Sequence, residues 1–181
     1  MQGYLLFVGT IEPRKGVHLL LEALTRVRKD FRLHLVGKVT DPSYKCRLDE
    51  YISSHDLSDK VVFEGVADKD GLDRFYNQAE LFVFPSQLEG FGIVLIEAMQ
   101  HGLPVVAFDN TAMPYTIKDG TNGYLAQNGN VAEMAEKIER IMGNTPEREK
   151  IQNGIKQHVY QLYTYEDFAA GVQSFWSTFT A

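Results

Sequence analysis

The stretch YLLFVGTIEPRKGVHLLLEALTRV, residues 4 to 27, contains two hydrophobic patterns in succession. YLLFVG, residues 4 to 9, is a short apolar run that ends in glycine, which is typical of a buried strand. The apolar residues after it recur at helical spacing, at Val17, Leu20, Leu21, Leu24 and Val27. The stretch therefore predicts one strand followed by one helix that buries a single face.

Strand-like and helix-like stretches keep alternating after this first unit. Apolar runs that predict strands, with helical segments between them, recur at FRLHLVG (31–37), VVFEG (61–65), LFVFPS (81–86), VVAF (105–108) and GYLAQ (123–127). Because no Asn-Gly hairpin joins neighbouring strands, the alternation predicts a parallel sheet with helices on both faces. From about Val131 the pattern is helical. We therefore expect one doubly wound α/β domain over residues 1–181, with a helical C-terminal segment.

Composition limits the classes of protein to consider. The chain has 181 residues and a formal net charge of -6, which fits a single soluble domain and argues against a nucleic-acid-binding surface. A single cysteine, Cys46, excludes a disulfide framework and a multi-cysteine metal cluster. We find no signal peptide and no apolar run long enough to span a bilayer. We expect a cytoplasmic protein in which any basic site for a phosphate is local.

Ligands of open α/β sheets bind in the loops after the strands, and GTIEPRKG (9–16) is the first such loop. Pro13 suits the first turn of a helix, but Arg14 and Lys15 place two positive charges where the macrodipole favours negative ones. An anion held by backbone N–H groups and both cations would resolve this conflict. Alternatively, both side chains extend into water. The loop is neither a Walker loop nor a GxGxxG turn.

The segment VFPSQLEGFGIVLIEAM (83–99) places two carboxylates in an otherwise apolar setting. Glu97 belongs to a helix that is apolar on nearly all sides, so it either lies at the rim or needs partners such as sugar hydroxyls. Glu89 precedes Gly90 and Gly92, which let a ligand approach the backbone where the next helix presents free N–H groups. These features predict a second anion site. In the alternative interpretation, Glu89 only complements the helix dipole and Glu97 is a satisfied structural acid.

Several segments together resemble the group 1 retaining glycosyltransferases. EGFGIVLIEAMQHGLPVVA resembles the segment with the spaced glutamate pair of that family, and FVGTIEPRKGVHLLLEAL resembles its first strand, phosphate loop and helix. The resemblance extends over nearly the whole chain through LHLVGKV, DKVVFEGVADKDGLDRFYNQAELFVFPS and DGTNGYLAQNGN. It implies the GT-B architecture of two Rossmann-like domains, of which this chain would be the C-terminal, donor-binding half.

The resemblance also implies roles for individual residues. Lys15 would bind the nucleotide diphosphate, Glu97 the ribose and Glu89 the transferred sugar, so that Glu89, Lys15 and Arg14 form the expected catalytic set. Gly65 and Val66 would lie beside the base. The full expected donor-binding set is Gly9, Thr10, Arg14, Lys15, Gly65, Val66, Glu89, Gly90, Phe91, Gly92, Ile93 and Glu97.

The implied activity is transfer of a hexosyl group, with retention, from a nucleoside diphosphate sugar to a saccharide or lipid acceptor. The donor would be of the GDP-mannose or UDP-glucose type, and no cofactor or metal is expected. The acceptor site would lie in an N-terminal domain, so this chain alone would bind donor without transferring it. Such an enzyme would work in the cytoplasm or at the cytoplasmic face of the membrane. A non-catalytic nucleotide or phospho-ligand binding module and half of a GT-B epimerase remain as alternatives.

Two positions depart from the family pattern. Thr10 stands where many members have arginine, so Arg14 is expected to supply the missing charge. A glycine pair before Pro-Glu is replaced by Thr111-Ala112-Met113-Pro114-Tyr115, which leaves the identity of donor and acceptor open.

Three remaining features have structural interpretations. His101 lies where a helix ends and is assigned a structural role. Asp68-Lys69-Asp70 has the form of a metal-binding DxD, but Asp70, with Asp73 three residues further on, better suits helix capping. A helix in YEDFAAGVQSFWSTF (165–179) would carry an apolar stripe of Phe168, Val172, Phe175, Trp176 and Phe179. The stripe either packs on its own domain or points toward a second domain, in which case the isolated chain would self-associate through it.

Overall fold

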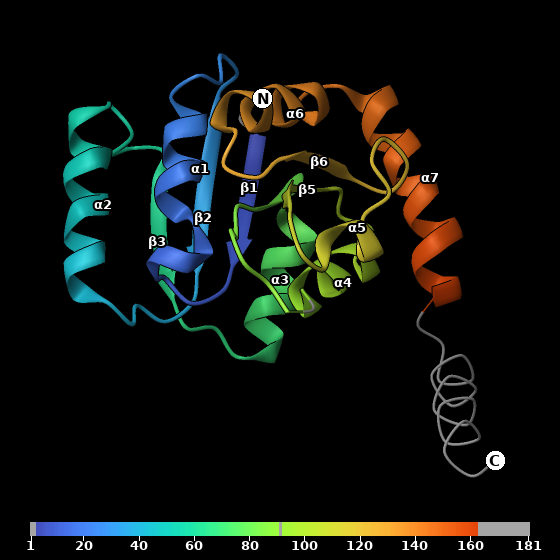
Figure 1. Ribbon diagram of the computed structural model, residues 1–181, viewed down its shortest axis with the longest axis horizontal. Helices are drawn as coiled ribbons and strands as arrows, with labels where there is room; N and C mark the ends of the chain where they lie inside the picture. The colour runs from blue at the N-terminus through green and yellow to red at the C-terminus, as the bar shows by residue number, and fades with distance from the viewer. Residues whose placement is uncertain (1–2, 91, 163–181) are drawn as a thin grey trace, which may run out of the picture.

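A six-stranded parallel sheet forms the centre of the protein (Figure 1). The computed structural model describes residues 3–90 and 92–162. The strand order is β3-β2-β1-β4-β5-β6, and every neighbouring pair is parallel. The strands are β1 (Gly3–Val8), β2 (Phe31–Val36), β3 (Val61–Gly65), β4 (Leu81–Phe84), β5 (Val105–Asp109) and β6 (Tyr124–Gln127). The predicted doubly wound α/β fold is confirmed.

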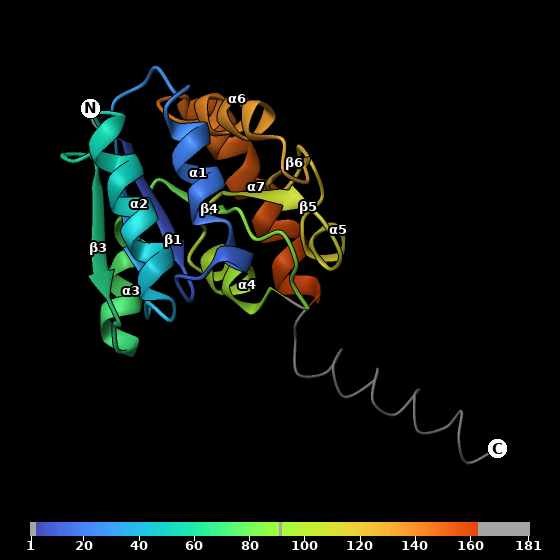
Figure 2. The ribbon, with the colours of Figure 1, turned by 60° about the vertical axis from the view of Figure 1, so that its left-hand side comes forward.

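Helices cover both faces of the sheet, as Figure 1 and Figure 2 show. They are α1 (Val17–Leu24), α2 (Pro42–Ser54), α3 (Lys69–Gln78), α4 (Ile93–Gln100), α5 (Met113–Thr116), α6 (Val131–Ile141) and α7 (Thr145–Leu162). α1 packs against α2 and α6, whereas α4 packs against α7. Because α7 contacts both α4 and α6, it lies beside both helical layers.

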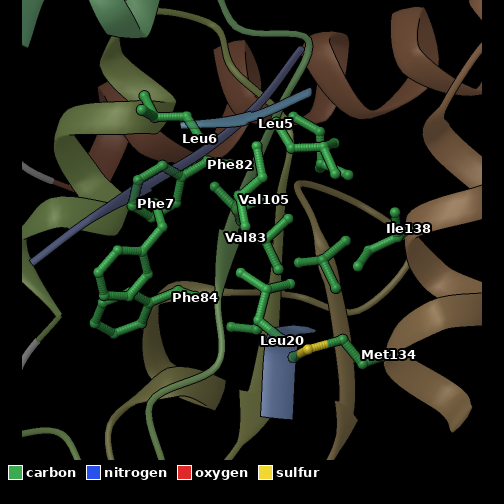
Figure 3. Close-up of a cluster of buried hydrophobic side chains, with 14 of the residues drawn as sticks. Leu5, Leu6, Phe7, Leu20, Phe82, Val83, Phe84, Val105, Met134 and Ile138 are labelled. Atoms are coloured by element: carbon green, nitrogen blue, oxygen red, sulfur yellow. The ribbon is translucent and has the colours of Figure 1, made fainter. Parts of the chain in front are cut away.

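The core lies between the central strands and the helices on either side. Figure 3 shows side chains of β1, β4 and β5 together with Leu20 of α1 and Met134 and Ile138 of α6. All four residues of β4 are buried, as expected for a central strand of a parallel sheet. The rings of Phe7, Phe82 and Phe84 stack with centroids 6.1 to 6.2 Å apart. This continuous apolar contact holds the carboxyl ends of β1 and β4 in fixed positions.

Most elements lie where the sequence predicts them. Each predicted strand starts or ends within two residues of its observed position. The first helix is shorter than predicted, because α1 ends at Leu24 and Val27 is buried in the following turn. α5 was not predicted, since a helix of four residues is too short to show a period. The predicted helix at 165–179 lies outside the described residues.

The strand order reverses between β1 and β4, which are neighbours at the centre of the sheet. Connections from these two strands therefore leave toward opposite faces, and the loops after them border the place where open α/β sheets bind ligands. Within residues 3–90 and 92–162, none of the helices has both the length and the apolar character needed to span a bilayer.

Candidate functional site

The loops after β1 and β4 lie against each other at this switch point. The Gln87 N–H donates to the Arg14 carbonyl at 3.1 Å. Gly16 has a φ of 71°, and a Cβ at this position would lie 2.0 Å from the Pro85 carbonyl oxygen. Only glycine fits both this backbone conformation and this close approach. The two loops, residues 9–16 and 85–90, are therefore joined at Arg14 and Gln87 and at Gly16 and Pro85.

The structure corrects the predicted position of the two cations. Arg14 and Lys15 belong to a 3-10 turn, Pro13–Lys15, and α1 begins only after Gly16. They precede the helix instead of forming its first turn, because the left-handed Gly16 turns the chain between the two elements. Their side chains reach across to the loop after β4. Acceptors on the loop after β4, and not the start of α1, therefore bind the two cations that the sequence placed against the helix dipole.

Lys15 and Glu89 form an ion pair, with Nζ and Oε2 separated by 2.5 Å. Both side chains are largely buried, with exposed fractions of 13% and 16%. Lys15 Nζ also lies 5.3 Å from the centroid of the Phe84 ring. An ammonium has three N–H donors, and among the described residues Glu89 is the one side chain that accepts from it. Two donors of a partly desolvated cation are thus left for water or a ligand.

Arg14 is held differently from Lys15. Its guanidinium donates to the Leu88 carbonyl at 3.1 Å and pairs with Glu12 at 2.7 Å. The side chain is about half exposed, at 48%. Arg14 therefore contributes positive charge at the mouth of the site, and it reaches the β4 loop through a backbone group.

Glu97 lies in α4 and has its own partners. Its Oε2 accepts a hydrogen bond from the Tyr76 hydroxyl at 3.1 Å. Burial, reinforced by the Glu97 carboxylate, raises the pKa of Tyr76, so the hydroxyl stays protonated and donates. From the described residues the other oxygen of Glu97, Oε1, accepts no hydrogen bond, so it can take a ligand hydroxyl. The structure does not bring Glu97 into contact with Lys15 or Glu89.

His101 packs directly against this pair. Its ring stacks on Tyr76 with centroids 5.0 Å apart, Nδ1 lies 2.9 Å from the Glu97 carbonyl oxygen, and Nε2 lies 3.3 Å from Asp73. Each ring nitrogen has a neighbour within α3 or α4, which supports the structural role predicted for His101.

The other predicted donor-binding residues lie along the same carboxyl edge of the sheet. Gly9 and Thr10 follow β1, and Gly65 and Val66 lie at the end of β3, where Val66 is 74% exposed. Gly90 precedes the start of α4, Gly92 is its N-cap in the left-handed conformation, and Ile93 is its first residue, 61% exposed. Among the described residues no side chain caps this helix, so N–H groups at its start are available to a ligand. Phe91 lies outside the described residues.

A cavity of about 840 Å³ adjoins the ion pair. Its lining residues are Arg14, Leu88, Glu89, Gly90, Thr111, Ala112, Tyr115 and Thr116. Half of them come from the β5 loop and α5, which the sequence indicated only as a departure from the family pattern. Their position directly after a predicted strand is the signal that could have placed them at the site.

The acidic segment before α3 acts as a helix cap. The Asp68 carboxylate accepts from the Gly71 N–H at 2.8 Å, and α3 begins at Lys69. Capping was predicted here, but the sequence interpretation assigned it to Asp70, which instead lies in the first turn. In the part of the chain that the structure describes, no group of three His, Cys, Asp or Glu residues is arranged to hold a metal ion.

Comparison with known proteins gives a consistent result. A sequence model of the family described as "Glycosyl transferases group 1" matches residues 1–158. Over 167 residues the chain is 32% identical to an uncharacterized glycosyltransferase of Methanocaldococcus jannaschii, which covers 91% of this chain and 42% of that protein. Over 173 residues it is 31% identical to the alpha-D-kanosaminyltransferase of Streptomyces kanamyceticus, and this match covers 92% of this chain and 44% of that protein.

The fold is also found in a solved structure of the Anabaena protein HepE in complex with UDP. The TM-score is 0.89 at 25% sequence identity, and the match covers 98% of this chain and 49% of that chain. The chain thus spans about half the length of the relatives that it matches.

Proposed function

The chain belongs to the group 1 glycosyltransferases, and we propose that it forms the donor-binding half of a retaining hexosyltransferase. The donor is a nucleoside diphosphate sugar of the UDP-glucose or GDP-mannose type, and the acceptor is a saccharide or a lipid. The observation that carries this proposal is Lys15, a partly buried ammonium at the β1/β4 switch point for which Glu89 is the one side-chain acceptor among the described residues.

The proposed donor lies along the carboxyl edge of the sheet. Lys15 and the open N–H groups of α4 bind the diphosphate, because a cation and a helix N-terminus both favour an anion. Oε1 of Glu97 accepts from a ribose hydroxyl, while Tyr76 holds the other oxygen of that carboxylate. Glu89 holds the transferred sugar, and the base lies beside Gly65 and Val66.

In the proposed mechanism the protein stabilises charge that develops during transfer. As the bond from sugar to diphosphate breaks, negative charge increases on the leaving phosphate, and the sugar becomes positively charged. Lys15 and Arg14 stabilise the leaving group, and Glu89 stabilises the sugar. The acceptor site belongs to the other half of the enzyme, which accounts for the relatives being about twice as long as this chain. The chain alone then binds donor without transferring it.

Substitution of Lys15 tests the proposal. Lys15→Ala should weaken binding of UDP or GDP, whichever the parent binds, by roughly 1.5 to 3 kcal/mol, the range for a hydrogen bond to a charged group. Titration calorimetry measures the affinities, and Lys156→Ala, an exposed lysine on α7, is the matched control and should bind like the parent. Equal affinities for parent and Lys15→Ala would remove Lys15 from the site.

A further inference from the structure

Thr111 has a backbone conformation that a β-branched residue rarely adopts. In the described chain two residues other than glycine have positive φ, Asp56 at 55° and Thr111 at 32°. Aspartate tolerates this region, whereas for threonine it is a genuine outlier. Such a residue persists only where surrounding contacts hold it, and strained positions of this kind cluster at functional sites. The contacts of Thr111 therefore indicate what the strain maintains.

A single hydroxyl of Thr111 engages both backbone groups of Glu89. Oγ1 lies 2.6 Å from the Glu89 carbonyl oxygen and 3.3 Å from the Glu89 nitrogen. A threonine hydroxyl has one proton to donate and lone pairs to accept. It donates to the carbonyl at the shorter distance and accepts from the N–H. Thr111 thus bonds to the backbone of Glu89 much as a neighbouring strand would.

Asn110 extends this contact to the start of the same loop. Its side-chain amide donates to the Ser86 carbonyl at 2.6 Å. Asn110 and Thr111 together hold the β4 loop at two points, while Arg14 holds it from the β1 side through the Leu88 carbonyl. Residues 85–90 of this loop form neither helix nor strand, so these side chains determine where their backbone lies.

We propose that Thr111 is a positioning residue that fixes the backbone of Glu89 and thereby keeps its carboxylate directed at Lys15 and at the donor sugar. The inference rests on the proposed function, in which Glu89 contacts that sugar. It adds a role for the β5 loop, where the hydroxyl of Thr111 fixes the loop that carries the sugar-binding acid.

Three substitutions separate positioning from simple structural support. Thr111→Ser keeps the hydroxyl, Thr111→Ala removes the hydroxyl and keeps the positive φ, and Thr111→Gly removes the hydroxyl and relieves the backbone strain. If Thr111 only supports the fold, the affinity for the nucleotide sugar should fall in step with thermal stability, and Thr111→Gly should lose less affinity than Thr111→Ala. If Thr111 positions Glu89, Thr111→Ala and Thr111→Gly should lose the same affinity, and Thr111→Ser should keep the parental affinity.

The experiment compares two probes on the full chain by titration calorimetry, UDP with UDP-glucose, or GDP with GDP-mannose if the parent prefers guanine. Thr111→Ala and Thr111→Gly should each lower the affinity for the nucleotide sugar relative to the nucleoside diphosphate by about fivefold, as expected for one lost hydrogen bond. Thr111→Ser should keep the parental ratio. An unchanged ratio in both variants without the hydroxyl overturns the proposal.

Amide hydrogen exchange of Glu89, followed by NMR, gives a second measurement that needs no ligand. The Glu89 N–H should exchange about fivefold faster in Thr111→Ala and Thr111→Gly than in the parent and in Thr111→Ser. Equal exchange rates of the Glu89 N–H in all four proteins would show that the Thr111 hydroxyl does not hold the Glu89 backbone. If the parent binds neither nucleoside diphosphate, it is the proposed function that fails, and the exchange data still decide whether Thr111 holds Glu89.

Discussion

Two ion pairs of equal length flank the same strand at opposite ends. Lys15–Glu89 lies beyond the carboxyl end of β4, and Arg148–Glu80 lies at its amino end, each with a separation of 2.5 Å. In both pairs the side chains are mostly buried. Length and burial therefore do not distinguish a binding site from a structural contact.

The two pairs differ in what else their members contact. Each carboxylate also accepts from a backbone N–H, Glu80 from Gly143 at 3.0 Å and Glu89 from Gly90 at 3.2 Å. The bonds of Glu80 join the start of β4, the turn after α6, and α7, whereas Gly90 lies in the same loop as Glu89. Both pairs line a cavity, Glu80 and Arg148 one of about 320 Å³ and Glu89 one of about 840 Å³. Among the described residues, Glu89 is the one side chain that accepts from Lys15. The amino-end pair therefore holds three segments of the fold together, whereas the carboxyl-end pair lies at the junction of two loops beside the larger of the two cavities. Location at the switch point gives the carboxyl-end pair its proposed function.

Of the changes that compare the two ion pairs, the largest effect is expected on stability, at the amino end. Glu80→Ala leaves two donors without their acceptor, so it should lower the free energy of unfolding by about 1 to 2 kcal/mol. Urea denaturation measures this change, and the affinity for UDP or GDP should stay at the parental value. Glu89→Ala, the matched change at the carboxyl end, should cost less, about 1 kcal/mol, because the Gly90 N–H that it leaves without its acceptor lies in the same exposed loop and can bond to water. Equal costs would erase the distinction between the two pairs.

A smaller effect is expected on affinity at the carboxyl end. Glu89→Gln removes a negative charge near the proposed diphosphate and releases Lys15, so binding of the nucleoside diphosphate should strengthen by about 1 kcal/mol. The gain for the nucleotide sugar should be smaller, since the sugar loses a charged acceptor. Calorimetry at low salt measures both, with Glu12→Gln as a control that neutralises a carboxylate paired to the more exposed Arg14. A weaker nucleoside diphosphate complex in Glu89→Gln would contradict this prediction.

The smallest effect concerns Glu97, which lies apart from both ion pairs. Glu97→Gln should reduce the preference for a ribonucleotide over its dideoxyribo analogue by about 1 kcal/mol or less, because an amide is a weaker acceptor than a carboxylate. Tyr76→Phe, which removes the hydroxyl bound to Oε2, serves as the comparison and should change this preference less. Competition binding with the two nucleotides measures the ratio. If Glu97→Gln retains the full preference, Glu97 is a structural acid.

Several features of the site could be predicted from residues close together in the sequence. The loops at Lys15 and Glu89 follow predicted apolar strands. Thr111, where the sequence departs from the family pattern, likewise follows the predicted strand VVAF. The partners of these residues could not be predicted in the same way. Tyr76 was assigned only to a helix face, although its hydroxyl fixes Glu97 from 21 residues away. The contact of Thr111 with Glu89 could not be predicted, because the residues around Thr111 do not indicate that the β5 loop lies beside the β4 loop.

The sequence by itself determined the order and type of the elements, because hydrophobic periodicity depends on neighbours within a few residues. It also determined which loops end strands and carry charge. Only the tertiary structure decided that Lys15 meets Glu89 across 74 residues, that the cations precede α1, and that a strained threonine holds the second acid in place. These contacts depend on the strand order β1-β4-β5, which is set by long-range packing of the strands and helices in the core and not by the pattern within any one segment.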